Sequence, residues 1–225
     1  MSERENILGR IREALQTKAP LPGPHQARGT VMPAVPAIRK WLPPVGTSAE
    51  EQTVLFAQNA ADLKADFQLF ASADELKTAL VKVRDAEKWR RIASHGGVLS
   101  DFACQALGLP VVLTDRGYHV QEMEQCDVAI TECDLLVAQT GGVVVTSRSA
   151  GGRALSVLPP HHVVIARRDQ LVADLPAAFS RLQQKYAPDY PSMISFITGP
   201  SRTGDIERIL VLGAHGPKRL TVFCL

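Results

Sequence analysis

The chain has 225 residues, which is somewhat more than one typical domain and short for two. Hydrophobic residues make up 45% of it, enough for a substantial core, so global disorder is excluded. The formal net charge is +2 with acidic and basic residues interspersed, which argues against a dedicated nucleic-acid-binding protein. We expect a single α/β domain with additional N-terminal material.

The cysteines and the N-terminus predict a cytoplasmic protein. The four cysteines (Cys104, Cys126, Cys133 and Cys224) form no Cys-x-x-Cys pair, which argues against zinc-ribbon and iron–sulfur spacings in this chain. Residues 1–16 are charged throughout and lack an apolar signal core, and no apolar run approaches the ~18 residues of a membrane span. We therefore expect no membrane span, no metal site and no bound cofactor.

Residues 1–18 are predicted to form an amphipathic helix, followed by a linker at 19–46. Ser2 and Glu5 form a capping-box pattern, and the apolar residues that follow share one helical face (Ile7, Leu8, Ile11 and Leu15). The linker is rich in proline, which lacks the N–H that a strand ladder needs. The helix covers either the main domain or a partner, and Trp41 in the linker is a second candidate anchor.

From residue 47 to 225 the pattern predicts a compact domain of alternating helices and strands. Capping boxes at Ser48 and Ser72 predict two helices, and Asp174 predicts a later one. Many of the β-prone runs are continuously apolar, as expected for strands covered on both faces (67–70, 91–94, 111–114, 128–131, 135–137, 143–146, 163–166, 194–196, 209–212 and 220–223). We expect an open, mainly parallel sheet with helices on both sides and ligands at the carboxyl ends of its strands.

Four turns combine glycine with polar side chains, at 94–97, 139–142, 147–153 and 196–217. None contains a Walker phosphate loop, a G-x-G-x-x-G fingerprint or a G-x-S-x-G nucleophile elbow. This argues against the commonest classes of NTPase, dehydrogenase and esterase.

Two of these turns offer binding groups for a ligand. At Thr140, Gly141 and Gly142 the backbone can approach a ligand closely, or it can simply form a hairpin turn. The loop from Ser147 to Arg153 offers hydroxyls, glycines and cations that suit a carboxylate or phosphate, although a solvated surface loop is an equal alternative.

Two adjacent histidines are weaker candidates, as ligands of a metal ion. His161 and His162 begin a predicted strand, so their side chains are expected to point to opposite faces of the sheet. This arrangement weighs against a metal ion that both would bind.

The turn that begins at Gly199 predicts an anion-binding site. Ser201 or Thr203 is expected to cap a short helix, and Arg202 stands at its N-terminus, where free N–H groups attract an anion. Asp205 and Glu207 would lie in the first turn of this helix. In the alternative interpretation they only favour the helix dipole.

A histidine and a glycine follow the next predicted strand. By residue type His215 is a candidate general acid or base, with Asp205 as a weaker one, although His215 could equally be a hydrogen-bonded turn residue. Gly216 gives the same turn an open backbone. We expect the binding groups of both turns to converge across one cleft (Thr140, Ser201, Arg202, Thr203 and His215).

Several segments together resemble the LUD domain, the lactate-utilisation family of the LutC/YkgG type. They are Gly199-Pro-Ser-Arg-Thr-Gly-Asp-Ile-Glu207, Leu210-Val-Leu-Gly-Ala-His-Gly-Pro217, His95-Gly-Gly-Val-Leu-Ser-Asp101, Val137-Ala-Gln-Thr-Gly141 and Leu158-Pro-Pro-His161. The resemblance runs from about residue 48 to the C-terminus. It implies a three-layer, Rossmann-like α/β fold related to sugar-phosphate isomerases and CoA transferases.

The resemblance also implies a role in oxidising L-lactate to pyruvate alongside iron–sulfur oxidoreductase partner proteins. This chain would be the cluster-free member and would bind a small anionic ligand, those partners, or both. One departure concerns Gln139, because many family members carry Glu-Thr-Gly-Thr at this place, and an amide can only hydrogen-bond. The alternative is a stand-alone enzyme or sensor for a CoA-linked, phosphorylated or folate-like molecule.

Overall fold

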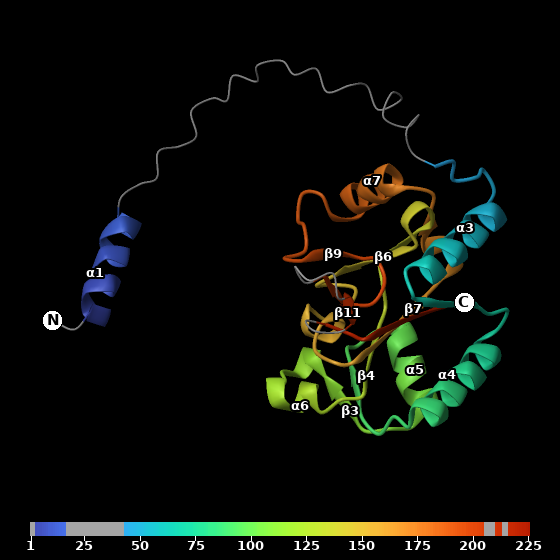
Figure 1. Cartoon of the computed structure of the whole chain (residues 1–225), viewed down its shortest axis with the longest axis horizontal. Coiled ribbons are helices and arrows are strands. Elements are labelled where there is room, and N and C mark those ends of the chain that lie inside the picture. Colours follow the sequence, from blue (N-terminus) through green and yellow to red (C-terminus); the bar gives the residue numbers. More distant parts are fainter. Residues whose placement is uncertain (1–2, 17–42, 205–209, 213–215) are drawn as a thin grey trace, which may run out of the picture. The chain divides into compact units, whose positions relative to one another are not determined.

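The computed structural model describes residues 3–16, 43–204, 210–212 and 216–225 (Figure 1). The chain divides into two units, Met1–Leu42 and Pro43–Leu225. The described part of the first unit is α1 (Glu3–Gln16), on which Ile7 and Leu8 are exposed. Ser2, most of the expected linker and Trp41 lie outside the described residues. Within those residues, no helix is both long and apolar enough to cross a membrane.

Helices of the second unit begin at the predicted caps. Before α3 (Ala49–Asp62), the Ser48 hydroxyl accepts from the Glu51 N–H and the Glu51 carboxylate accepts from the Ser48 N–H, both at 3.1 Å. Ser72 caps α4 (Ala73–Glu87) and Asp174 caps α7 (Leu175–Tyr186). These local signals therefore predicted three helix starts. The second unit also contains α5 (Val98–Leu107) and α6 (Val120–Glu124).

The main sheet has six strands in the order β1-β12-β7-β4-β2-β3, and every neighbouring pair is parallel. The strands are β1 (Asp66–Leu69), β2 (Ile92–Ser94), β3 (Val111–Leu113), β4 (Val128–Thr131), β7 (His161–Ala166) and β12 (Arg219–Cys224). The predicted parallel α/β sheet is confirmed. Its three central strands, β12, β7 and β4, are buried along almost their whole length.

A second sheet has the order β8-β5-β6-β9 and contains antiparallel pairs. Its strands are β5 (Leu135–Val137), β6 (Gly142–Thr146), β8 (Leu171–Val172) and β9 (Ile194–Ile197). A hairpin of β10 (Arg202–Gly204) and β11 (Leu210–Leu212) forms a third, smaller sheet. The prediction placed all these runs in one sheet. The turn between β5 and β6 is too short for the crossover that parallel neighbours need, so these strands pair antiparallel.

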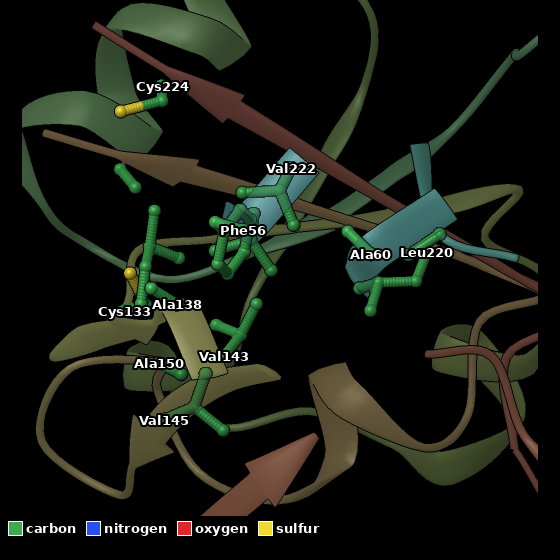
Figure 2. Packing of buried hydrophobic residues seen from close by; sticks show 14 of the residues in the cluster. Phe56, Ala60, Cys133, Ala138, Val143, Val145, Ala150, Leu220, Val222 and Cys224 are labelled. Carbon is green, nitrogen blue, oxygen red and sulfur yellow. The ribbon is translucent and has the colours of Figure 1, made fainter. Parts of the chain in front are cut away.

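The sheets and helices stack in layers within this unit. The helices α4 and α5 pack on one face of the parallel sheet, and α3 packs on the other together with the second sheet (Figure 1). The helix α7 covers the outer face of the second sheet. Figure 2 shows Phe56 and Ala60 of α3 among Leu220 and Val222 of β12, with Val143 of β6 close by. The expected helices on both sides of the sheet are thus confirmed.

Candidate ligand-binding site

A cavity of about 520 Å³ lies between the second sheet and the amino ends of β7 and β12. One wall is the segment 196–202, which comprises the end of β9 and the turn after it. His162 and Leu220 contribute from the parallel sheet, and the remaining lining residues are Leu63, Ser156, Val157, Gly216 and Pro217. We call this the Arg202 cavity. Its volume falls in the range of roughly 300–1,000 Å³ that is typical of small-molecule pockets.

The turn from Thr198 to Arg202 is held against the end of α3. Gly199 has φ +87°, and a Cβ at this position would lie 2.6 Å from the carbonyl oxygen of Leu63. Only glycine therefore fits both the conformation and the space. The Arg202 guanidinium donates to the same Leu63 carbonyl. On the other side, the Ser201 N–H donates to the Pro217 carbonyl at 2.9 Å.

The expected start of a helix at Ser201 or Thr203 is wrong, and Asp205 and Glu207 of its expected first turn lie outside the described residues. Arg202 to Gly204 form β10, in which Arg202 pairs with Leu212 of β11. Hydroxyl and acidic residues favour turns as well as helix caps, and pairing with a distant apolar strand decided between the two here. The predicted anion site is thus not a helix N-terminus. It also lies beside the amino ends of parallel strands rather than their carboxyl ends, because β9 belongs to the second sheet.

The cavity combines one cation with a largely apolar wall. Among the lining residues that the structure describes, Arg202 carries the one formal charge, and its side chain is exposed. His162 is 1% exposed, and burial, followed by the nearby His161, lowers its pKa to about 3, so it is neutral. Val157 and Phe196 contribute apolar surface. This arrangement suits a ligand with an anionic group and an apolar body.

The Thr140 turn forms the hairpin between β5 and β6. Gly141 has φ +61°, and a Cβ there would lie 2.5 Å from the backbone nitrogen of Ala60 in α3. A Cβ at Gly142 would lie 3.0 Å from the Thr140 hydroxyl and 3.1 Å from the Thr198 methyl. Thr140 and its two glycines therefore lie near the Thr198 turn but outside the lining of the Arg202 cavity. Ligand binding by these three residues stays a prediction.

The loop from Ser147 to Arg153 is engaged in contacts of its own. The Ser147 N–H donates to the Met193 carbonyl at 3.0 Å, and the Ser147 hydroxyl accepts from that of Ser192 at 3.2 Å. Arg153 is exposed, and its carbonyl accepts from the Ser156 hydroxyl at 3.0 Å. Neither Ser147 nor Arg153 lines the Arg202 cavity, although Ser156 does.

The carboxyl end of β2 is filled by the protein itself. The Nε2 atom of His95 accepts from the Glu132 N–H at 3.2 Å, which leaves Nδ1–H to donate to the Gly96 carbonyl at 3.0 Å. The Glu132 carboxylate accepts from the Leu99 N–H at 2.8 Å and so occupies the N-terminus of α5. These internal bonds leave the polar groups of the turn little capacity for a ligand.

A smaller cavity of about 310 Å³ lies between α7, the start of β5 and the segment 167–170 that precedes β8. Its charged groups bond to the protein itself. The Asp134 carboxylate accepts from Lys185 and from the Tyr186 hydroxyl, both at 2.6 Å, Arg167 pairs with Asp169 at 3.3 Å, and Arg181 donates to the Asp169 carbonyl at 3.1 Å. Burial alone would raise the pKa of Asp134, but these hydrogen bonds hold it below its ordinary value. We therefore rank this cavity below the Arg202 cavity.

Of the predicted binding residues, the structure places Gly199, Ser201, Arg202 and Gly216 around one cavity. The side chain of Thr203, together with Asp205 and His215, lies outside the described residues. His161 and His162 do point to opposite faces, since their Nε2 atoms pair with Thr221 and Thr131 respectively, each at 2.9 Å.

The sequence interpretation missed the part of His162 in this cavity. It weighed the two histidines only as metal ligands. The period-two alternation of a strand showed that the two side chains face opposite sides of the sheet, but not which side carries a cavity. Leu63 and Ser156 were also missed, because nothing in the surrounding sequence indicates that they line a cavity.

Comparison with known proteins identifies the family. A family model described as the LUD domain matches residues 84–225. A protein from Shouchella clausii called lactate utilization protein C is 28% identical over 86% of this chain and 87% of its own. Another of the same name, from Bacillus licheniformis, is 36% identical over 63% of this chain and 68% of its own.

A crystal structure shares the fold. It is that of a DUF162 family protein from Deinococcus radiodurans, with a TM-score of 0.63 and 22% identity over 80% of this chain and 99% of the other. The match of the family model to most of the second unit, together with these relatives, means that the chain belongs to the LUD domain family.

Proposed function

We propose that this protein takes part in lactate utilisation as a cluster-free component that binds an anionic small molecule in the Arg202 cavity. The observation that carries this proposal is the grouping of Ser201, Arg202 and two glycine turns around one cavity. A guanidinium, a hydroxyl and open backbone are the groups that surround carboxylate and phosphate oxygens in proteins.

The part played in lactate utilisation is supported by the relatives. Proteins from Shouchella clausii and Bacillus licheniformis that share this domain are named lactate utilization protein C. The resemblance noted from the sequence further suggests that the chain works alongside iron–sulfur oxidoreductase proteins. The exposed Ile7 and Leu8 of α1 are the apolar side chains that we assign to contact with such a partner.

A second candidate function is favoured by the size of the cavity. At about 520 Å³ it is much larger than a three-carbon acid requires. A sensor or stand-alone enzyme for a CoA-linked, phosphorylated or folate-like molecule would use the same anionic contact at Arg202. In either case the ligand carries more apolar surface than lactate itself.

The proposal is tested by growth on L-lactate. A deletion strain is complemented with the wild-type gene, with Arg202→Ala or with Arg202→Lys. Loss of a charge-assisted hydrogen bond costs about 1.5–3 kcal/mol, which corresponds to roughly 10- to 100-fold in ligand affinity. We expect Arg202→Ala to impair growth on L-lactate but not on glucose, and Arg202→Lys to restore it in part, because a lysine keeps the charge and loses the fork.

A matched control is Arg116→Ala, which removes an exposed arginine far from this cavity in the sequence and outside its lining. It should grow like the wild type. The melting temperature of each variant separates loss of binding from loss of folding, because Arg202 also contacts Leu63. The proposal would be ruled out if the Arg202→Ala variant folds and its strain grows normally on L-lactate.

A further inference from the structure

His162 is a buried residue in the lining of the Arg202 cavity, and one of its ring nitrogens has no partner among the described residues. Its side chain is 1% exposed and is among those that line the cavity. The Nε2 atom is paired with the Thr131 hydroxyl at 2.9 Å. The Nδ1 atom has no hydrogen-bond partner among the described residues.

An unpaired ring nitrogen at this depth needs an explanation. A neutral imidazole has one donor and one acceptor nitrogen, and a buried polar atom without a partner costs about 1–3 kcal/mol. Native proteins leave few such atoms unpaired, and each one calls for an explanation, such as a chemical role or a bound water or ion.

The neighbouring His161 shows what a histidine without such a site looks like. Its Nδ1 is also unpaired within the described residues, but its ring packs edge-on against Trp89 with the ring centres 5.2 Å apart. His161 is not among the residues that line the Arg202 cavity. The two residues therefore form a matched pair in which only His162 borders space for a ligand.

We infer that His162 is a binding residue of the Arg202 cavity and that its Nδ1 forms a hydrogen bond with an uncharged polar group of the ligand. This rests on the proposed function, in which Ser201 and Arg202 hold the anionic group. Val157, Phe196, Ile197 and Leu220 contribute apolar surface to the same cavity. The ligand class is thus an organic acid or phosphate ester with an apolar body and a hydroxyl or carbonyl group.

The inference can be tested with two aromatic acids that differ by one hydroxyl group. 3-Phenyllactate has the carboxylate, the apolar ring and the hydroxyl, whereas 3-phenylpropionate lacks the hydroxyl. Binding of both acids to the full chain is measured by titration calorimetry. For the wild type we expect about tenfold tighter binding of 3-phenyllactate, the equivalent of one hydrogen bond.

The informative variant is His162→Gln. The glutamine amide reaches the place of Nε2, so it keeps the bond to Thr131 and removes the group at Nδ1. We expect the ratio of the two affinities to fall from about tenfold to about one. His161→Gln should leave the ratio of affinities unchanged, while Arg202→Ala should weaken the binding of both acids by a similar factor.

Each outcome supports or overturns a stated claim. Suppose that both acids bind the wild type, that both bind Arg202→Ala more weakly, and that the ratio of their affinities is unchanged in His162→Gln. The role of His162 is then wrong, and the proposed function stands. If Arg202→Ala binds both acids like the wild type, the anion site itself is wrong. If neither acid binds the wild type, the ligand class assigned here is wrong.

A measurement on the wild type guards against a misfolded variant. The ¹⁵N chemical shift of His162 Nδ1 should change when 3-phenyllactate is added, and that of His161 Nδ1 should not. Equal response of both nitrogens, or of neither, would contradict the inference.

Discussion

His161 and His162 are neighbours in the chain but belong to different layers of the molecule. His161 faces the helical layer and Trp89, and His162 faces the second sheet and the Arg202 cavity. Each uses Nε2 for a threonine hydroxyl on an adjacent strand. Because both are buried in the parallel sheet, both are kept in the neutral form.

This burial predicts a loss of stability in mild acid. Burial is the main cause that lowers the pKa of His161 to about 4 and that of His162 to about 3, whereas a histidine in the unfolded chain titrates at 6.5. Below pH 6.5 the unfolded chain therefore binds protons that the folded chain does not. The stabilisation is complete above the unfolded pKa and is lost as the pH falls toward 4 and 3.

At about pH 5 each histidine should lower the free energy of unfolding by roughly 2 kcal/mol relative to neutral pH. Urea unfolding at pH 7 and pH 5 measures this change, with His161→Gln and His162→Gln as variants that should each reduce it. A wild-type protein whose unfolding free energy is the same at both pH values would show that these side chains are not buried as described.

At the scale of the elements, two glycine turns bring the second sheet and the cavity wall against α3. Gly141 packs on the backbone of Asn59 and Ala60, and Gly199 packs on Leu63 at the end of the same helix. The Asn59 amide also donates to the carbonyls of Ala138 and Gln139, at 2.8 and 3.0 Å. Both glycine turns thus pack directly against α3 and the residue that follows it.

We predict that Gly141→Ala is far more destabilising than Gly108→Ala. Both glycines adopt positive φ, +61° and +63°, but a Cβ at Gly108 meets nothing within 4 Å. The left-handed conformation alone costs an alanine about 1 kcal/mol, whereas Gly141→Ala must also displace the backbone of α3, at a further cost of about 1–3 kcal/mol. Equal midpoints of urea unfolding for the two variants would contradict the close contact with α3.

Local signals predicted three helix starts of the second unit, whereas strand pairing decided the structure after Gly199. Ser48, Ser72 and Asp174 mark helix starts because a cap involves only residues a few positions apart. Arg202 to Gly204 carry no comparable signal for a strand, since their partners in β11 lie six to ten residues later in the chain. The hydroxyl residues after Gly199 therefore suggested a helix start where residues 202–204 instead form a strand, and Asp205 and Glu207 lie outside the described residues.

At the scale of the whole second unit, the Arg202 cavity is made by segments that are far apart in the sequence. Leu63 ends α3, His162 lies in β7, and Gly216 precedes β12. The sequence identified the glycine turns and Arg202 because their residue types suit an anion. It did not identify His162, because facing a cavity depends on how the second sheet packs on the first.

The packing of α3 between the two sheets holds these segments in place. Phe56 is fully buried, and its ring meets that of Phe67 at 4.9 Å between centres. This helix contacts both sheets, and the carbonyl of Leu63, the residue that caps its C-terminus, accepts from Arg202. The same helix therefore supports both the core and the cavity.

The central claim is that this cavity binds the ligand, and a crystal structure of the full chain with 3-phenyllactate tests it most directly. The account predicts density in the Arg202 cavity, with the carboxylate at about 3 Å from the Arg202 guanidinium and the Ser201 hydroxyl, and with the ligand hydroxyl at a similar distance from His162 Nδ1. Density for the acid in the smaller cavity beside Asp134, or beside His95, with none between Arg202 and His162, would contradict binding in the Arg202 cavity.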